Sequence, residues 1–444
     1  MRHIETIKSV VLLLLVLLSI TFTFSIWSYA PKFDSIDPDQ SVDGSITSVH
    51  NKKPISDIVL PYKWVFKFNN DELFGTTDTT VIQPVLEEMM RWKVFGLTSV
   101  NQELTPEELH SILTKGNQYS LYYSGEVPVS VYEDVLEIED KNIPEILFNR
   151  LIVNWNPEDS LPEVHFISTV SMTHYKAKVK MEDTQRFQKS IIDKGKRLSQ
   201  YKEVQVNETR TIAVSSEPIT AIHSTYIEEE INPSLFKDAL FNDPNAVRKN
   251  SLGTNTEEYG DDHALMNVNT KTKVLNFAYP PESLEIAIPS ELMTATIDFV
   301  NDHSGWTDDY RYSYMNPVSR YIKFQLHDNG LPVFSDVPDG AEITEKLGEN
   351  RVYKYIRPYF TLNSPIKTYE VTLPPATEVA RQLQASEDLD FTAIEEIKPG
   401  YLLIHDTDVG VLKFEPHWFY YVKGNWEMYE QELNRKGGGL LGLE

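Results

Sequence analysis

The chain has 444 residues, of which 41% are hydrophobic and 11% aromatic, enough apolar material for roughly two to four folded domains. Its 66 acidic residues outnumber its 41 basic ones, and the net charge of −25 argues against binding to nucleic-acid phosphates. The chain contains no cysteine, which excludes disulfides, thiol nucleophiles, iron–sulfur clusters and cysteine-type zinc sites.

The first predicted element is a single transmembrane helix over residues 9–30. No charged residue lies between Lys8 and Lys32, and at 1.5 Å per residue this stretch makes a helix of about 34 Å, enough to cross a hydrocarbon core of about 30 Å. Basic residues precede the span and acidic residues follow it. We therefore expect a cytoplasmic tail at residues 1–8 and the bulk of the chain outside the cytoplasm, at the cell membrane.

A cleaved signal peptide is the alternative to a retained anchor. Residues 28–30 read Ser-Tyr-Ala, which matches the small-x-small pattern of a cleavage site. Two features oppose cleavage. The apolar stretch is longer than the 7 to 15 residues usual in a signal peptide, and Pro31 would follow the cut, where proline hinders cleavage.

Four hydroxyl residues are the candidate contact residues of the expected span. Ser19 and Thr23 are four residues apart on one face of the helix, and Thr21 and Ser25 lie on a neighbouring face. Such hydroxyls can bond across a helix–helix interface, with about 1 kcal/mol each. They can also bond back to their own helix, and the sequence leaves both possibilities open.

Beyond the anchor we expect a flexible stalk and an N-terminal α+β domain. Residues 31–54 are rich in Asp, Ser, Pro and Gly, which indicates the stalk. The domain over 55–213 opens with a strand at 62–68, in which Lys63 and Lys67 face away from the aromatic residues. We expect its helices at 80–92, from 106 to Gly116 and over 183–202, and further strands at 119–123, 127–132, 164–170 and 174–181. Thr105 and Glu108 form the capping-box pattern that starts the second of these helices.

Two further α+β domains are expected over 214–338 and 339–434, followed by a flexible tail at 435–444. Their strands are predicted at 273–278, 310–314, 321–327, 352–362, 367–373, 402–405, 411–414 and 418–422, and their helices at 233–240, 289–304 and 375–385. In each domain a strand ends in two prolines, at 277–281 and 371–375. This repeated pattern suggests that the last two domains share a topology. The fold class is therefore α+β, with mainly antiparallel sheets and packed helices in a three-domain body.

Several common catalytic signatures are absent from the sequence: the G-x-S-x-G elbow, H-E-x-x-H, the P-loop and the dinucleotide-binding glycine pattern. Residues 261–263 (Asp-Asp-His) are better explained as a polar loop than as metal ligands, and residues 406–410 as a hairpin turn than as a calcium loop, because the twelfth-position glutamate is missing. No catalytic, cofactor-binding or metal residue is therefore assigned, and no cofactor is expected. A glycosidase pair has no local sequence pattern, so the 66 carboxylates leave that alternative open.

Three stretches of the chain resemble the YycH (WalH) family: residues 4–12 (IETIKSVVL), 26–31 (IWSYAP) and 235–244 (LFKDALFNDP). The resemblance in length, anchor and three-part layout covers essentially the whole chain, although these motifs are structural stretches and carry no catalytic code. It implies an accessory regulator of the WalK–WalR (YycG–YycF) two-component system of low-GC Gram-positive bacteria, which governs cell-wall metabolism. It also implies a sister partner, YycI (WalI), and contact with the sensor kinase through membrane helices and outside domains.

These observations lead to two hypotheses about function. In the first, the protein is a single-pass regulator and not an enzyme, whose body modulates the WalK (YycG) sensor histidine kinase together with YycI (WalI) by protein–protein interaction. In the second, it is a membrane-anchored wall-active enzyme or wall-ligand receptor with a carboxylate-lined cleft between domains. Converging carboxylates in a cleft would favour the second, and flat apolar patches would favour a protein partner.

Overall fold

The computed structural model of the chain describes Ile46 and residues 52–101, 103–141, 143–155, 161–280, 285–348 and 351–430. The expected span 9–30, with Ser19, Thr21, Thr23 and Ser25, lies outside the described residues, as do the expected tails 1–8 and 435–444. Within the described ranges, none of the helices combines the length and apolarity that a membrane crossing requires.

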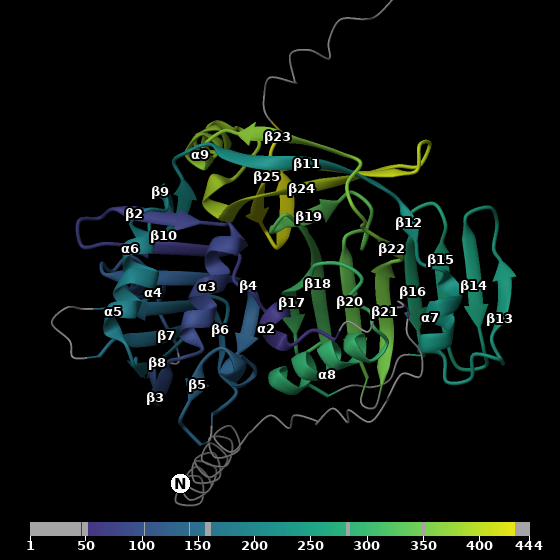
Figure 1. Cartoon of the computed structure of the whole chain (residues 1–444), viewed down its shortest axis with the longest axis horizontal. Helices are drawn as coiled ribbons and strands as arrows, with labels where there is room; N and C mark the ends of the chain where they lie inside the picture. The colour runs from purple at the N-terminus through teal and green to yellow at the C-terminus, as the bar shows by residue number, and fades with distance from the viewer. Residues whose placement is uncertain are drawn as a thin grey trace, which may run out of the picture.

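Two large sheets lie side by side and form the body (Figure 1). The first comes from the N-terminal half of the chain and is antiparallel except for the β3–β5 pair. Its ten strands run in the order β10 (Arg210–Ser215), β9 (Ser199–Asn207), β2 (Leu73–Thr76), β1 (Lys63–Lys67), β4 (Gln118–Pro128), β6 (Leu147–Asn154), β7 (Glu163–Ser168), β8 (Thr173–Lys180), β3 (Lys93–Asn101) and β5 (Glu137–Ile138).

The second sheet has fourteen strands within the described residues. Its main path is β13 (Arg248–Ser251), β14 (Thr256–Gly260), β15 (Leu265–Asn269), β16 (Val274–Ala278), β21 (Val352–Pro358), β20 (Glu342–Leu347), β18 (Tyr321–Asp328), β19 (Leu331–Ser335), β24 (Ile394–Asp406), β25 (Val411–Val422), β11 (Ile219–Ile227) and β23 (Lys367–Leu373). Off this path, β17 (Tyr310–Asn316) pairs with β18 and β26 (Asn425–Met428) with β25. A separate short pair joins β12 (Glu229–Glu230) to β22 (Phe360–Thr361).

Short helices cover the sheets, and several of them add buried apolar residues to a core made largely by the strands. The described helices are α2 (Ile55–Ile58), α3 (Thr79–Met89), α4 (Pro106–Leu113), α5 (Thr184–Phe187), α6 (Asp193–Gly195), α7 (Pro233–Leu240), α8 (Pro289–Asp302) and α9 (Ala376–Ala385). Two 3₁₀ turns lie at Val129–Asp134 and Phe391–Ala393, and a π-helical turn at Gln188–Ile192. On α8, Leu292, Met293, Ile297 and Val300 are buried, as expected for one apolar stripe of an amphipathic helix.

The prediction of mainly antiparallel sheets with packed helices is confirmed. The capping box is also confirmed: the Thr105 hydroxyl accepts a hydrogen bond from the Glu108 amide at 3.2 Å, and the Glu108 carboxylate accepts one from the Thr105 amide at 2.9 Å. The helix expected over 183–202 is wrong at its end. Helical structure stops at Gly195, where the Phe66 ring leaves no room for a side chain, and β9 begins four residues later to pair with β2 and β10.

The three-domain layout and the shared topology of the last two domains stay predictions. Strands on either side of the boundary expected at 338/339 are hydrogen-bonded to one another. Strand β21 pairs with β16, and β23 and β25 both pair with β11. The segments expected as two domains therefore share one continuous sheet.

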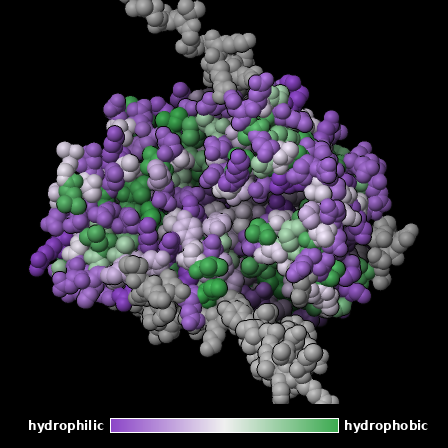
Figure 2. Space-filling view, turned by 180° about the vertical axis from the view of Figure 1, so that it is seen from behind, coloured by the Kyte–Doolittle hydropathy of each residue, from purple (hydrophilic) through white to green (hydrophobic). Residues whose placement is uncertain are grey.

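The two sheets are joined by apolar packing. One hydrophobic cluster brings Val206, Ile212 and Val214 of the first sheet against α9 and against Ile397 and Trp418 of the second sheet. The expected stalk also contacts the body at Ile46. This residue is buried, and its amide donates a hydrogen bond to the His303 carbonyl at 2.9 Å. Figure 2 shows the opposite face of the molecule, where polar residues predominate and hydrophobic residues gather in small separate groups.

Candidate functional site between the two sheets

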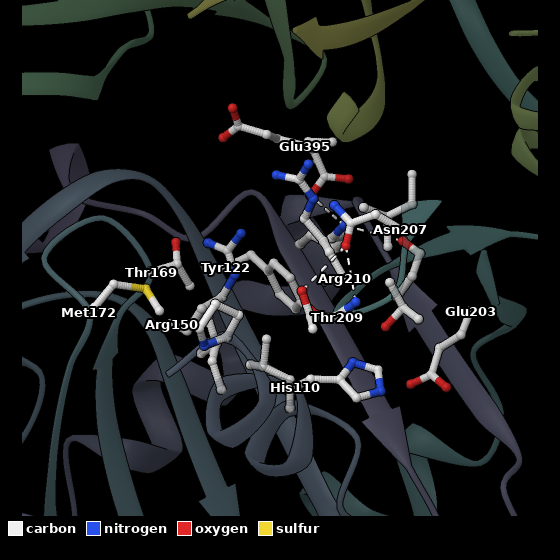
Figure 3. Close-up of a pocket in the computed structure, with 18 residues that line it drawn as sticks. His110, Tyr122, Arg150, Thr169, Met172, Glu203, Asn207, Thr209, Arg210 and Glu395 are labelled. Atoms are coloured by element: carbon white, nitrogen blue, oxygen red, sulfur yellow. Dashed lines mark hydrogen bonds and ion pairs between the residues drawn. The ribbon is translucent and has the colours of Figure 1, made fainter. Parts of the chain in front are cut away.

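A pocket of about 360 Å³ lies where the ten-stranded sheet meets β24 (Figure 3). Strands β1, β4, β6, β9 and β10 and helix α4 of the N-terminal half supply most of the wall, and β24 closes it from the other sheet. The lining residues are Lys63, Pro106, Leu109, His110, Leu113, Tyr122, Arg150, Thr169, Met172, Glu203, Asn207, Thr209, Arg210, Thr211, Ile212, Ala213, Glu395 and Glu396. The pocket is therefore shared by residues far apart in the sequence.

A buried ion pair joins the two sheets beside this pocket. The Lys63 ammonium group lies 2.6 Å from a Glu396 carboxylate oxygen, and their side chains are 2% and 8% exposed. The same carboxylate oxygen accepts a hydrogen bond from the Tyr62 hydroxyl at 2.6 Å, and Lys63 also donates to the Ala213 carbonyl at 3.2 Å. Burial alone would raise the pKa of Glu396, but its contacts with Lys63 and Tyr62 hold that pKa below its usual value.

A second buried lysine lies next to this ion pair. Lys398 is 2% exposed, and its ammonium group lies 4.1 Å from the centre of the Trp426 ring and 4.9 Å from that of Tyr62. These rings attract a cation through their π faces. Burial lowers the pKa of Lys398 to about 7, although the neighbouring Glu396 raises it. Lys398 and Glu396 thus bring two ionisable groups of β24 against the N-terminal half.

Two guanidinium groups line the pocket without an ion-pair partner among the described residues. Arg150 stacks at 4.2 Å on the Tyr122 ring and donates to its neighbouring carbonyl, that of Asn149, at 2.8 Å. Arg210 donates from Nη2 to the Thr392 carbonyl at 2.6 Å, while its buried Nε–H has no acceptor in the described part of the chain. Figure 3 shows both residues drawn at the pocket, from β6 and β10.

The apolar part of the pocket comes from α4 and the neighbouring Met172. Leu109 and Leu113 of α4 pack beside the buried residues Leu104, Ile152 and Ile167. The capping box fixes the start of this helix. At the other end of the helix, the Gln118 side-chain amide donates to the Ile112 and Leu113 carbonyls at 2.8 and 3.0 Å. These are among the last backbone carbonyls of the helix, which have no hydrogen-bond donor within it.

The structure places the other motifs singled out in the sequence away from this pocket. Residues 261–263 form a turn in which the Asp261 carboxylate accepts the amides of His263 and Ala264 at 2.7 and 2.6 Å, as expected for a polar loop. Residues 406–410 connect β24 to β25, and the Asp406 carboxylate pairs with Lys413 at 2.8 Å, as expected for a hairpin. No group of three metal-ligating side chains occurs in the described ranges.

The pocket residues were not identified from the sequence. Lys63 and Lys67 lie on the face of β1 opposite to Trp64 and Phe66, as the alternation predicts, yet all five residues of the strand are buried. Charge on one face of a strand usually indicates exposure to solvent. The only local signal was a strand with lysines on one face and aromatic residues on the other, and it does not reveal the carboxylate that lies 333 positions further along the chain.

These observations define a body of two sheets. A buried ion pair joins the sheets, and a pocket lies between them. Two family models match the chain, "YycH protein, N-terminal domain" over residues 5–195 and "YycH protein, C-terminal domain" over residues 209–437. The chain therefore belongs to the YycH family.

A curated relative and a solved structure agree with this assignment. The chain is 22% identical over 456 residues to the "Two-component system WalR/WalK regulatory protein YycH" of Bacillus subtilis (strain 168), with 99% of each chain covered. It is also similar to the crystal structure of YycH from Bacillus subtilis, with a TM-score of 0.72 and 17% identity. That match covers 86% of this chain and 98% of the other, and it shows that the two share a fold.

Proposed function

We propose that this protein is a regulator of a WalR/WalK two-component system that modulates the sensor kinase WalK (YycG) together with YycI (WalI), and thereby affects cell-wall metabolism. One observation carries the proposal. The Bacillus subtilis relative, which aligns with this chain over 99% of both lengths, is named as a WalR/WalK regulatory protein. In this proposal residues 9–30 anchor the chain in the cell membrane, residues 1–8 stay in the cytoplasm, and the body lies outside.

The edge of the second sheet supports a role in protein binding. Strand β23 ends the main path of that sheet, and its first four residues, Lys367 to Glu370, are all exposed. An edge strand presents backbone N–H and C=O groups that a partner strand can pair with. Strand β13 at the opposite end is also exposed, but its four residues are all polar or charged (Arg, Lys, Asn and Ser). Strand β23 differs because it carries the exposed Tyr369 and follows the exposed Ile366, and aromatic residues are enriched at protein interfaces.

The pocket gives less support to the rival proposal of an anchored wall enzyme. Acid catalysis by a carboxyl group needs a raised pKa, whereas the pKa of Glu396 is lowered. Glu203 is paired with Lys67 at 2.9 Å. Among the carboxylates that line the pocket, this leaves only Glu395 without a cation within ion-pair distance among the described residues.

In-cell crosslinking with affinity capture tests the proposal. The full-length protein is compared with a version whose residues 9–30 are replaced by an unrelated apolar span. We expect the native chain to capture a sensor kinase and a sister anchor protein, and we expect the replacement to weaken this capture and to change a WalR-dependent reporter. Recovery of wall material without a kinase would move the assignment to the enzyme or receptor.

A pair of photo-crosslinkers tests the edge strand separately. One replaces Glu370 on β23 and the matched control replaces Asn250 on β13, since both residues are exposed on an edge of the same sheet. We expect the partner proteins to be captured from position 370 and not from position 250. Equal capture from both positions would remove β23 as the docking edge and leave the regulatory role standing.

A further inference from the structure

The charges around the pocket between the sheets do not cancel. Lys63 is neutralised by Glu396 at 2.6 Å and Glu203 by Lys67 at 2.9 Å. The lining charges that remain are the guanidinium groups of Arg150 and Arg210 and the exposed carboxylate of Glu395. With Lys67 counted, which pairs with Glu203 but does not itself line the pocket, four cations face three carboxylates here, in a protein whose net charge is −25.

The two arginines are positioned to bind an anion. Arg150 lies over the Tyr122 ring and donates a hydrogen bond to the Asn149 carbonyl. These contacts restrict its side chain before any ligand arrives, which reduces the entropy cost of binding. Arg210 has a buried Nε–H without an acceptor within the described ranges, and a buried donor of this kind costs free energy until it is satisfied. Guanidinium groups bind carboxylate and phosphate oxygens through paired hydrogen bonds.

Part of the remaining wall is apolar and favours a ligand with an apolar group. Leu109, Leu113 and Met172 line the same pocket as the arginines. Its volume of about 360 Å³ lies within the range of about 300 to 1,000 Å³ found for small-molecule sites. A ligand that satisfies both parts has an anionic group at one end and an apolar group at the other.

We propose that this pocket binds a small organic anion, with its carboxylate or phosphate group held by Arg150 and Arg210 and its apolar part packed against α4 and Met172. The inference goes beyond the regulatory role, because it concerns a ligand site within the body and needs no partner protein. The ligand would touch both sheets, since Glu395 and Glu396 of β24 close the pocket that the N-terminal half forms.

Calorimetric titration of the full-length chain in a neutral detergent tests the site with three probes of equal chain length. Hexanoate carries a carboxylate, hexyl phosphate carries a phosphate, and hexanol carries no charge. We expect saturable binding of at least one anion, at least tenfold tighter than hexanol, and weaker binding at higher salt. The stronger anion identifies which of the two head groups the site prefers.

Substitutions locate the binding. Arg150→Gln and Arg210→Gln should each weaken the anion at least tenfold, whereas Arg248→Gln on the exposed strand β13 should leave it unchanged. Leu109→Trp keeps both charges and fills the apolar part, so it should also abolish binding, which provides a test should an arginine variant fail to fold. Absence of anion binding, equal binding of hexanol, or equal loss in Arg248→Gln would overturn the proposal.

Discussion

Removing the charge of Glu396 is expected to destabilise the protein strongly, because it leaves Lys63 buried without a counter-charge. At the observed separation of 2.6 Å, the attraction amounts to about 6 kcal/mol for an effective dielectric constant of about 20. The desolvation of both ions offsets much of this in the native pair. Once the carboxylate is gone only the desolvation of Lys63 remains, so Glu396→Gln should lower the free energy of unfolding by about 3 to 5 kcal/mol.

Urea unfolding of the full-length chain, followed by tryptophan fluorescence, measures this loss. Adding Lys63→Met to Glu396→Gln should restore at least about 2 kcal/mol, since the unpaired charge is then absent. The control is Glu137→Gln, which breaks the Lys93–Glu137 pair of β3 and β5. Both side chains of that pair are exposed, at 42% and 59%, so this change should cost about 1 kcal/mol or less. Additive effects of the two substitutions at Lys63 and Glu396 would refute the reasoning.

Three further predictions follow from single residues. Because burial lowers the pKa of Lys398 to about 7 from 10.5, the unfolded chain binds more protons than the native chain above pH 7. The lysine should therefore add about 2 kcal/mol to the free energy of unfolding between pH 7 and pH 9, and unfolding of Lys398→Met across this range should lack that rise. Gly125→Ala would place a methyl group 2.8 Å from the Tyr312 hydroxyl and 2.9 Å from the Ser313 carbonyl. It should cost about 1 to 3 kcal/mol and speed amide exchange in β4 and β17, unlike Gly260→Ala, where the nearest atom is a Leu265 methyl at 3.3 Å. Thr105→Ala removes the cap of α4 and should cost about 1 kcal/mol in thermal or urea unfolding, while Thr105→Ser keeps the hydroxyl and should cost little.

The sequence predicted those parts of the fold that depend on neighbouring residues. Strand β23 was expected at 367–373 and is observed as Lys367–Leu373, because its alternating β-branched and aromatic residues favour an extended chain. The start of α4 was predicted from Thr105 and Glu108, which are three positions apart and need no other part of the chain to form their hydrogen bonds.

The pairing of distant strands and the site between the sheets could not be predicted in this way. Strand β16 pairs with β21, about 80 positions further along the chain, and nothing in either strand specifies the other. In the sequence, Lys63 lies at a position typical of a solvent-facing residue. In the folded protein, Glu396 and the rest of β24 cover it. Whether a buried charge is tolerated depends on the partner that tertiary structure brings to it.

The junction and the pocket share residues, so ligand binding and the arrangement of the two sheets are linked. Glu396 belongs to the ion pair that joins the sheets and also lines the pocket next to Arg150. An anion bound to Arg150 and Arg210 would lie beside this pair, and any movement of β24 would change its contacts. A ligand shifts such an equilibrium only by its difference in affinity for the two arrangements. An anion that binds the joined sheets tenfold more tightly than separated ones would stabilise the junction by about 1.4 kcal/mol, and by reciprocity a partner protein that favours the same arrangement would tighten anion binding.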